Sequence, residues 1–296
     1  MASCTRYAYR PIADHPKFLW PGGAGVAVWV IPNVEHYPFG QPGVTVNDRA
    51  AASRPDVLNH SWRDYGPRVG IWRLFDCLSD LGVKVSATLN SDVCDEYPRL
   101  VEEGCRRGWE WIGHGTDNSV RLSTLSEDDE RALVGATLDR ISAATGRRPR
   151  GWLGPGLAES ARTPEILHEA GIEYVCDWVA DDLPFALGIE DGGQILSLPY
   201  SIELNDMELI LRQRLTGDQY RQRLIDQFEQ LSEEATAHQT GRVMAVPLHP
   251  FLTGQAHRIR YLHDALSHIA GHQGSWLATG SEIMDHYQST VMDPSE

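Results

Sequence analysis

The sequence predicts an α/β protein in which one domain, residues 1–296, forms a barrel of parallel strands joined by helices. Two observations lead to this prediction. Short apolar or β-branched runs alternate with longer segments of helical spacing, which is the pattern of parallel strands with crossover helices. The length of 296 residues is ordinary for one such barrel, and no linker, repeat or charge block divides it.

Eight segments have the composition of strands. Most are short, apolar and bounded by Gly, Pro or polar residues, as buried strands of a parallel sheet usually are. The predicted strands cover residues 26–31, 83–89, 109–113, 151–154, 172–177, 195–199, 243–248 and 276–278.

Helices are predicted between these strands from apolar spacing and from capping residues. Ser126 followed by Asp129 indicates an N-cap with an acidic first turn, Thr163-Pro164 is a typical helix start, and Gly82 and Gly171 are typical stops. The predicted helices cover residues 69–78, 97–107, 126–144, 163–171, 216–238, 258–269 and a last segment capped by Thr279 or Ser281.

The composition limits the function. A formal net charge of −15 argues against nucleic-acid binding and against binding to an anionic membrane surface, because both need a positive face. The five cysteines are odd in number and lack C-x-x-C spacing, which favours free thiols in a reducing compartment. No export signal or membrane span is evident, so we expect a cytoplasmic protein that acts on a small molecule.

Polar residues follow several predicted strands directly. Glu35 and His36 follow the first strand, His114 the third, Asp177 ends the fifth, and His249 follows the strand at 243–248. Active sites of α/β barrels lie at the carboxyl ends of the strands, so these residues are expected to meet in one pocket. The alternatives are a capping or ion-pairing role for Glu35 and an ordinary loop around His114.

The residue types in this pocket suit acid–base chemistry. Burial at a strand end is expected to raise the pKa of Glu35, as a general base requires, and a neutral imidazole of His114 or His249 can bind a metal or move a proton. His114 and Asn118 have i, i+4 spacing, which suits two ligands or two groups that orient a substrate. Trp178 and Phe251 are expected to flank a substrate ring.

Several common catalytic motifs are missing from the sequence. It contains no G-x-G-x-x-G, P-loop, H-E-x-x-H or G-x-S-x-G pattern. This argues against nucleotide chemistry and against a serine hydrolase of the nucleophile-elbow type.

The ordered set of strand-end segments resembles the polysaccharide deacetylase superfamily, and within it the branch of metal-independent allantoinases and related cyclic-amide hydrolases. The resemblance covers residues 9–287. The segments that carry it are His15-Pro16 to Trp20-Pro21-Gly22, Asn33-Val34-Glu35-His36, Arg63-Asp64-Tyr65-Gly66, Arg68-Val69-Gly70, Gly113-His114-Gly115 with Asn118-Ser119, Gly151-Trp152-Leu153-Gly154, Tyr174 through Asp177 to Asp181-Asp182-Leu183-Pro184, and Leu248-His249-Pro250.

The resemblance implies a distorted (β/α) barrel of the NodB-like type with about seven strands. It places Glu35 at the general-base position and His249 at the general-acid position. His36 stands where the family has a metal-binding Asp, and His114 and Asn118 stand where it has two metal-binding His. The amide of Asn118 is a poor zinc ligand, so the resemblance implies either no required cofactor or a rearranged zinc site of His114 with Glu35 or His36.

The resemblance implies a hydrolase of carbon–nitrogen bonds that opens a small cyclic amide such as allantoin, a hydantoin or an imide. Glu35, His249 and His114 are expected to be catalytic, with the ring carbonyl held by His114 and Asn118. The expected substrate-binding residues are Asn118, His36, Trp178, Asp177, Phe251 and Trp152. Two alternatives remain: a carbohydrate N- or O-deacetylase with a rearranged metal site, and a non-catalytic binding protein on a decayed barrel. We also expect a homo-oligomer.

Overall fold

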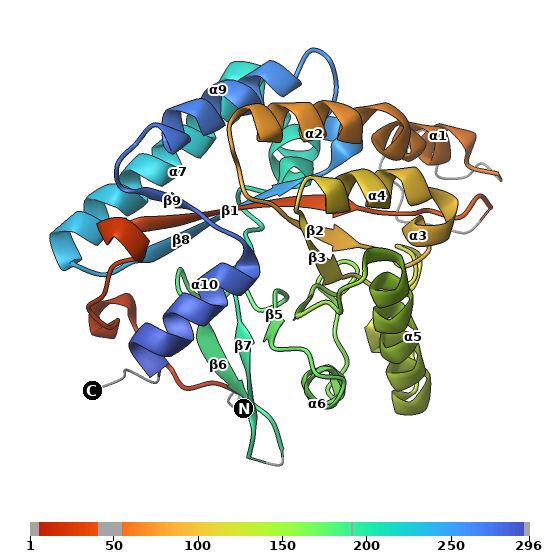
Figure 1. Ribbon diagram of the computed structural model, residues 1–296, viewed down its shortest axis with the longest axis horizontal. Helices are drawn as coiled ribbons and strands as arrows, with labels where there is room; N and C mark the ends of the chain where they lie inside the picture. The colour runs from red at the N-terminus through yellow and green to blue at the C-terminus, as the bar shows by residue number, and fades with distance from the viewer. Residues whose placement is uncertain (1–5, 41–54, 191, 293–296) are drawn as a thin grey trace.

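The computed structural model describes residues 6–40, 55–190 and 192–292. Its centre is a nine-stranded sheet in the order β6-β7-β5-β4-β3-β2-β1-β8, with β9 paired to β1 (Figure 1). All neighbours are parallel except β6 and β7, which form an antiparallel pair. The sheet curls into a half-barrel, which agrees with the predicted distorted (β/α) barrel, and it has nine strands where about seven are expected. The strands are β1 (Val26–Val34), β2 (Ser86–Leu89), β3 (Glu110–Gly113), β4 (Gly151–Trp152), β5 (Tyr174–Val175), β6 (Phe185–Gly188), β7 (Gln194–Ser197), β8 (Arg242–Leu248) and β9 (Ser275–Leu277).

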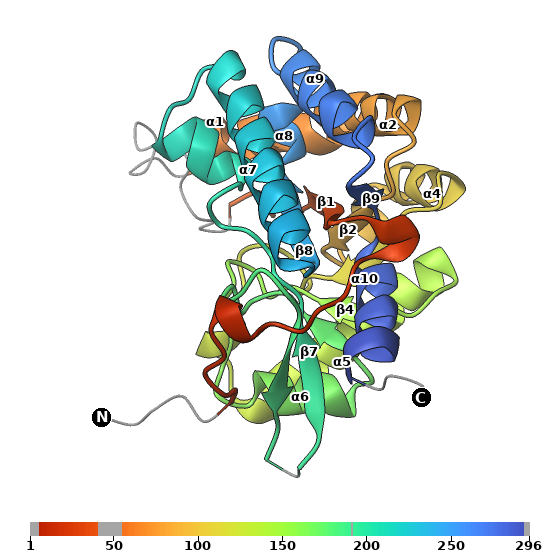
Figure 2. The same ribbon diagram turned by 90° about the vertical axis from the view of Figure 1, so that its left-hand side faces the viewer.

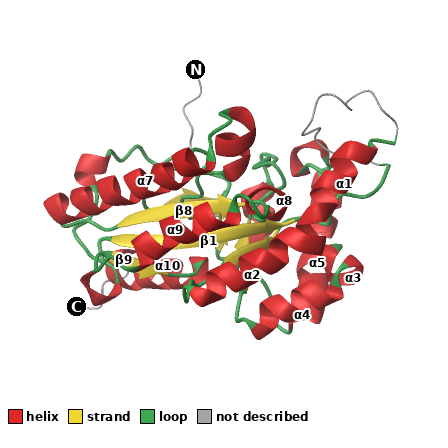
Figure 3. Ribbon diagram, turned by 90° about the horizontal axis from the view of Figure 1, so that it is seen from above, coloured by secondary structure: helices red, strands yellow, loops and turns green. Residues whose placement is uncertain are grey.

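Helices cover the outside of this sheet, and Figure 3 shows α2, α4, α7 and α9 lying along it. No helix in the described part of the chain is long and apolar enough to cross a membrane. The helices are α1 (Val57–Tyr65), α2 (Ile71–Asp80), α3 (Val93–Glu96), α4 (Pro98–Arg106), α5 (Glu127–Thr145), α6 (Thr163–Glu169), α7 (Gly217–His238), α8 (Pro250–Thr253), α9 (Ile259–Ala270) and α10 (Gly280–Tyr287).

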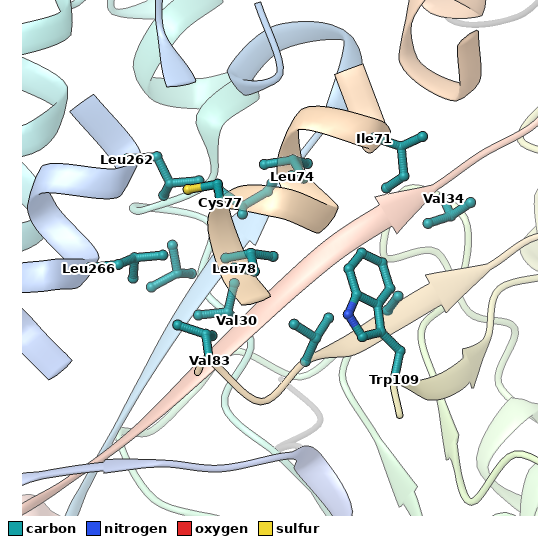
Figure 4. Close-up of a cluster of buried hydrophobic side chains, with 14 of the residues drawn as sticks. Val30, Val34, Ile71, Leu74, Cys77, Leu78, Val83, Trp109, Leu262 and Leu266 are labelled. Carbon is teal, nitrogen blue, oxygen red and sulfur yellow. The ribbon is translucent and has the colours of Figure 1, made fainter. Parts of the chain in front are cut away.

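Strand β1 is buried on both faces, and its side chains alternate between two cores. Val28 and Val30 belong to the outer core between the sheet and the helices, which Figure 4 shows with residues of α2 and α9 packed over β1. Trp29 and Ile31 point the other way, into the inner core that fills the barrel. The parity of a residue along a strand therefore decides whether its side chain reaches the barrel interior.

Each predicted strand and helix overlaps an observed one, and the sequence misses several short elements. Strand β6 and helices α1, α3 and α8 are not predicted. Strand β6 forms a hairpin with β7, which projects from the sheet beside α6 (Figure 2). Its sequence Phe185–Gly188 lies among loop-like residues and is too short to show a period.

Candidate active site

Three side chains lie just beyond the carboxyl ends of their strands. They keep the alternation of the strand and point into the barrel. Glu35 follows β1, His114 follows β3 and His249 follows β8. His114 has the same parity as Ile112, and His249 has the same parity as Ala245, both of which lie in the inner core. The alternation that builds the barrel interior thus brings these three residues together, as the sequence predicts.

The carboxylate of Glu35 is the centre of the cluster. Its Oε1 accepts a hydrogen bond from Asn118 Nδ2 at 2.7 Å, and its Oε2 accepts one from the Tyr37 hydroxyl at 2.8 Å. The same Oε1 lies 3.5 Å from His114 Nε2 and 3.9 Å from His249 Nε2. One carboxylate oxygen therefore faces two imidazole nitrogens inside the barrel.

This environment overturns the expectation that the pKa of Glu35 is raised. Burial does raise the pKa of this carboxyl, but the neighbouring imidazoles of His114 and His249 and the hydrogen bond from Tyr37 outweigh burial. The pKa of Glu35 is lowered to about 2. Glu35 is thus ionised throughout the neutral range, because each neighbour stabilises the anion.

His249 is held by a second buried carboxylate. Asp206 accepts a hydrogen bond from the His249 backbone N at 2.7 Å, lies 2.7 Å from His249 Nδ1, and accepts one from the Thr253 hydroxyl at 2.5 Å. Burial lowers the pKa of His249, but the charge and hydrogen bond of Asp206 and the charge of Glu35 outweigh it and raise the pKa. His249 is therefore suited to donate a proton from Nε2 at neutral pH.

His114 is held by the backbone. Its Nδ1 lies 2.6 Å from the carbonyl oxygen of Leu153, which can only accept, so Nδ1 carries the proton. The buried Nε2 forms no hydrogen bond with a described residue, and neither does the buried Oδ1 of Asn118. The amide orientation of Asn118 follows from the network, because its Nδ2 donates to Glu35 and to the Tyr37 hydroxyl at 2.6 Å. The amide hydrogens of Asn118 are thus already used, and its free atom is an acceptor, which differs from the expectation that Asn118 holds a carbonyl.

A buried cation lies over the aromatic ring of Tyr37. The buried Arg63 guanidinium, from helix α1, lies 3.7 Å from the centre of the Tyr37 ring. A cavity of about 20 Å³, enough for about one water molecule, opens here beside Glu35. The described residues that line it are Asn33, Val34, Glu35, Tyr37, Arg63, Gly66, Pro67, Ile71, Leu100, Pro250 and Phe251.

Two of the predicted substrate-binding residues lie beside this cluster. The Phe251 ring is 6.0 Å from the His249 ring and lines the cavity. Asp177 accepts a hydrogen bond from the backbone N–H of Gly154, at 2.9 Å from Oδ1 and 3.0 Å from Oδ2. Trp178 lies further out, where its Nε1 donates to Glu159 at 2.9 Å and its ring contacts Tyr7 edge-on.

Two other predicted residues are placed elsewhere. Trp152 is fully buried in the outer core with Leu138 of α5, because it has the opposite parity to Leu153, which faces the barrel interior. Its role is therefore core packing and not contact with substrate. The His36 ring packs near Tyr97 at 5.8 Å, and only its backbone supports the cluster, since its carbonyl accepts from the Asn118 N–H at 3.0 Å.

The donor set does not fit a divalent metal. No group of three or more His, Cys, Asp or Glu residues in the described chain is placed to hold an ion. Asn118 directs an N–H at Glu35 Oε1, the oxygen closest to His114, so its amide nitrogen offers no lone pair to an ion placed between these two residues. His36, expected at a metal-ligand position, turns its ring toward Tyr97.

Sequence reasoning missed Tyr37 and Asp206. The signal for Tyr37 was available, because residues i and i+2 of an extended segment share a face and Tyr37 comes two residues after Glu35. Asp206 follows no predicted strand and precedes His249 by 43 positions, so only the fold brings the two together. Arg63 is in one of the segments that carry the resemblance, without an assigned role.

Comparisons with known proteins agree with the fold. A family model described as polysaccharide deacetylase matches residues 56–175. A Schizosaccharomyces pombe protein, provisionally named a polysaccharide deacetylase, is 24% identical over 312 residues, covering 94% of this chain and 94% of that protein. The crystal structure of PuuE allantoinase has a TM-score of 0.85 and 23% identity, covering 93% of this chain and 94% of its own. A structure from Pseudomonas aeruginosa PAO1, also provisionally named a polysaccharide deacetylase, has a TM-score of 0.81 and 24% identity, covering 95% and 96%.

Proposed function

We propose that this chain, which belongs to the polysaccharide deacetylase superfamily, is a hydrolase that opens a small cyclic amide by general acid–base catalysis. The substrates we propose are allantoin, a hydantoin or an imide. One observation carries the proposal: Oε1 of the ionised Glu35 lies 3.5 Å from His114 Nε2 and 3.9 Å from His249 Nε2. A proton acceptor and a proton donor thus lie within reach of the same substrate atoms.

The proposed reaction uses these groups in sequence. Glu35 takes a proton from water as the oxygen attacks the ring carbonyl carbon. His249 gives its Nε2 proton to the ring nitrogen as the carbon–nitrogen bond breaks, which leaves a carboxylic acid and a ureide or amide group on one opened molecule. The proton on Glu35 returns to His249 across the 3.9 Å between them and restores the starting state.

The low pKa of Glu35 supports an activated carbonyl as the substrate. A carboxylate whose pKa is lowered by its neighbours is a weaker base than a free carboxylate, so deprotonation of water at this site has less driving force. Ureide and imide carbonyls are more electrophilic than the carbonyl of a simple acetamide and need less help from the base. This argument favours cyclic ureides and imides over N-acetyl sugars.

Two buried acceptors support a substrate that carries N–H groups. His114 Nε2 and Asn118 Oδ1 are buried and accept no hydrogen bond from a described residue. An unsatisfied buried acceptor costs about 1–3 kcal/mol, so a ligand that donates to it is favoured. The ring N–H groups of a hydantoin or an imide are donors of this kind, and they lie next to the carbonyl that is attacked.

A second candidate is the deacetylation of an N- or O-acetylated carbohydrate. The family match over residues 56–175 and the name of the S. pombe relative favour it. In the relatives so named, the printed names refer to polysaccharide substrates.

A substrate panel separates the two candidates. Purified protein is incubated with allantoin, hydantoin and succinimide, and in parallel with chitooligosaccharides and acetylated xylan, and ring opening or acetate release is quantified. We expect ring opening of at least one cyclic amide, and its loss in Glu35→Gln. Turnover of chitooligosaccharides with no turnover of any cyclic amide would refute the proposal.

A further inference from the structure

We infer that Asp177 is a positioning residue for His114 and acts through the peptide group that joins Leu153 to Gly154. The Asp177 carboxylate accepts the Gly154 N–H at 2.9 Å and 3.0 Å. The Leu153 carbonyl, on the other side of the same peptide bond, accepts from His114 Nδ1 at 2.6 Å. One rigid peptide unit therefore links the carboxylate to the imidazole.

The sheet holds the peptide unit directly before this one. Leu153 N donates to the Gly113 carbonyl at 2.9 Å, and Cys176 N donates to the Trp152 carbonyl at 2.9 Å, so both neighbouring strands bind the Trp152–Leu153 unit. A Cβ atom on Gly154 would lie 3.2 Å from Asp177 Oδ2 and 3.0 Å from the Ala158 carbonyl. Glycine therefore allows the close approach of Asp177 to the backbone.

Glu159 completes the arrangement on the far side of Asp177. Its carboxyl group accepts from Trp178 Nε1 at 2.9 Å. Burial raises the pKa of both carboxyls, and the charge of Asp177 raises that of Glu159 further. Glu159 is therefore the carboxyl that stays protonated at neutral pH, and Asp177 is the anion that faces Gly154.

The consequence for His114 is electrostatic. A peptide unit carries its dipole from the carbonyl oxygen to the N–H, and an anion at the N–H end makes the carbonyl a stronger acceptor. A stronger acceptor favours the proton on Nδ1 of His114, which leaves Nε2 to face the pocket. Asp206 likewise favours a proton on Nδ1 of His249, by direct contact with that nitrogen. Each imidazole of the site thus has its own carboxylate, one direct and one through a peptide.

Nitrogen NMR of the ¹⁵N-histidine-labelled protein tests the inference without reference to a substrate. In the wild-type protein, the His114 signals, assigned by their absence in His114→Gln, should show Nδ1 protonated. In Asp177→Asn, which keeps an acceptor for Gly154 but removes the charge, we expect a measurable fraction with Nε2 protonated. Where the proposed hydrolysis is observed, kcat should fall about tenfold or more, the size typical when an outer partner of a functional histidine is removed.

Asp182→Asn is the matched control, because it removes a carboxylate from the same loop without a contact to Gly154 or His114. It should leave the His114 spectrum unchanged. A wild-type His114 with Nε2 protonated, or an unaltered His114 spectrum in a folded Asp177→Asn variant, would overturn the inference. An altered spectrum in a protein that hydrolyses no cyclic amide would support the positioning role and refute only the proposed function on which the kinetic readout rests.

Discussion

Replacement of Asp206 by Asn tests the acid half of the proposed mechanism. Asp206 is fully buried, and its carboxylate contacts both the backbone N and Nδ1 of His249. The substitution keeps the size of the side chain and removes the charge that raises the pKa of His249. The imidazolium form of His249 then loses its main stabilising partner.

The size of the effect follows from the contact. A hydrogen bond to a charged group contributes about 1.5–3 kcal/mol, and about 1.4 kcal/mol corresponds to a tenfold change in an equilibrium constant. Removal of the Asp206 charge should therefore lower the pKa of His249. The proton donor is lost as the pH rises through the pKa of His249. The alkaline limb of kcat should therefore move to lower pH, and the rate on that limb should fall about 10- to 100-fold.

The assay measures kcat and kcat/KM for ring opening from acid to alkaline pH, below room temperature. Loss of one partner from a buried ion pair costs about 3–5 kcal/mol of stability, so circular dichroism must show that the variant is folded. Thr253→Val is the matched control, because it removes a 2.5 Å hydrogen bond to the same carboxylate and keeps the charge. A folded Asp206→Asn variant whose alkaline limb coincides with that of the wild type would refute the assignment of His249 as the acid.

Three further predictions concern the base, the substrate and the packing. Glu35→Gln should lower kcat about 100-fold or more, measured by ring opening at neutral pH, and a rate within a few-fold of wild type would show that Glu35 is not the base. N-methylation of a cyclic substrate at the nitrogens next to the carbonyl should lower kcat/KM about tenfold or more, because His114 Nε2 and Asn118 Oδ1 then receive no hydrogen bond from the substrate. Equal values of kcat/KM for the parent and N-methylated compounds would argue against these two hydrogen bonds. Gly70→Ala should destabilise the protein by about 1–3 kcal/mol in thermal unfolding, because the new Cβ would lie 1.9 Å from the Pro250 carbonyl oxygen beside His249. An unchanged melting temperature would contradict this packing.

The sequence predicted the strands and the residues at their ends because both depend on local pattern. Runs such as Val26–Val34 are buried on both faces and interrupted by polar residues only where the strand ends. Glu35, His114 and His249 could therefore be assigned to one pocket before any contact was known. The sequence also shows whether a residue takes an inward or an outward position along its strand. This alternation would have placed Trp152 on the outer face of the sheet.

The remaining features of the site depend on contacts between distant segments. Arg63 reaches Tyr37 from helix α1, and Asp206 reaches His249 from a polar segment between β7 and α7. The pKa of Glu35 could not be predicted from burial alone, since burial and the hydrogen-bonded neighbours act in opposite directions and the neighbours dominate. The direction of such a shift is decided by which donors surround the carboxylate.

In the proposed mechanism, Glu35 and the two imidazoles carry out hydrolysis without a metal that activates water. The decisive measurement is the metal content of the purified protein by plasma emission spectrometry, together with ring-opening activity before and after chelation. The proposed mechanism predicts far less than one metal ion per chain and unchanged activity after chelation. Near-stoichiometric zinc with activity that is lost on chelation and restored by zinc would contradict it.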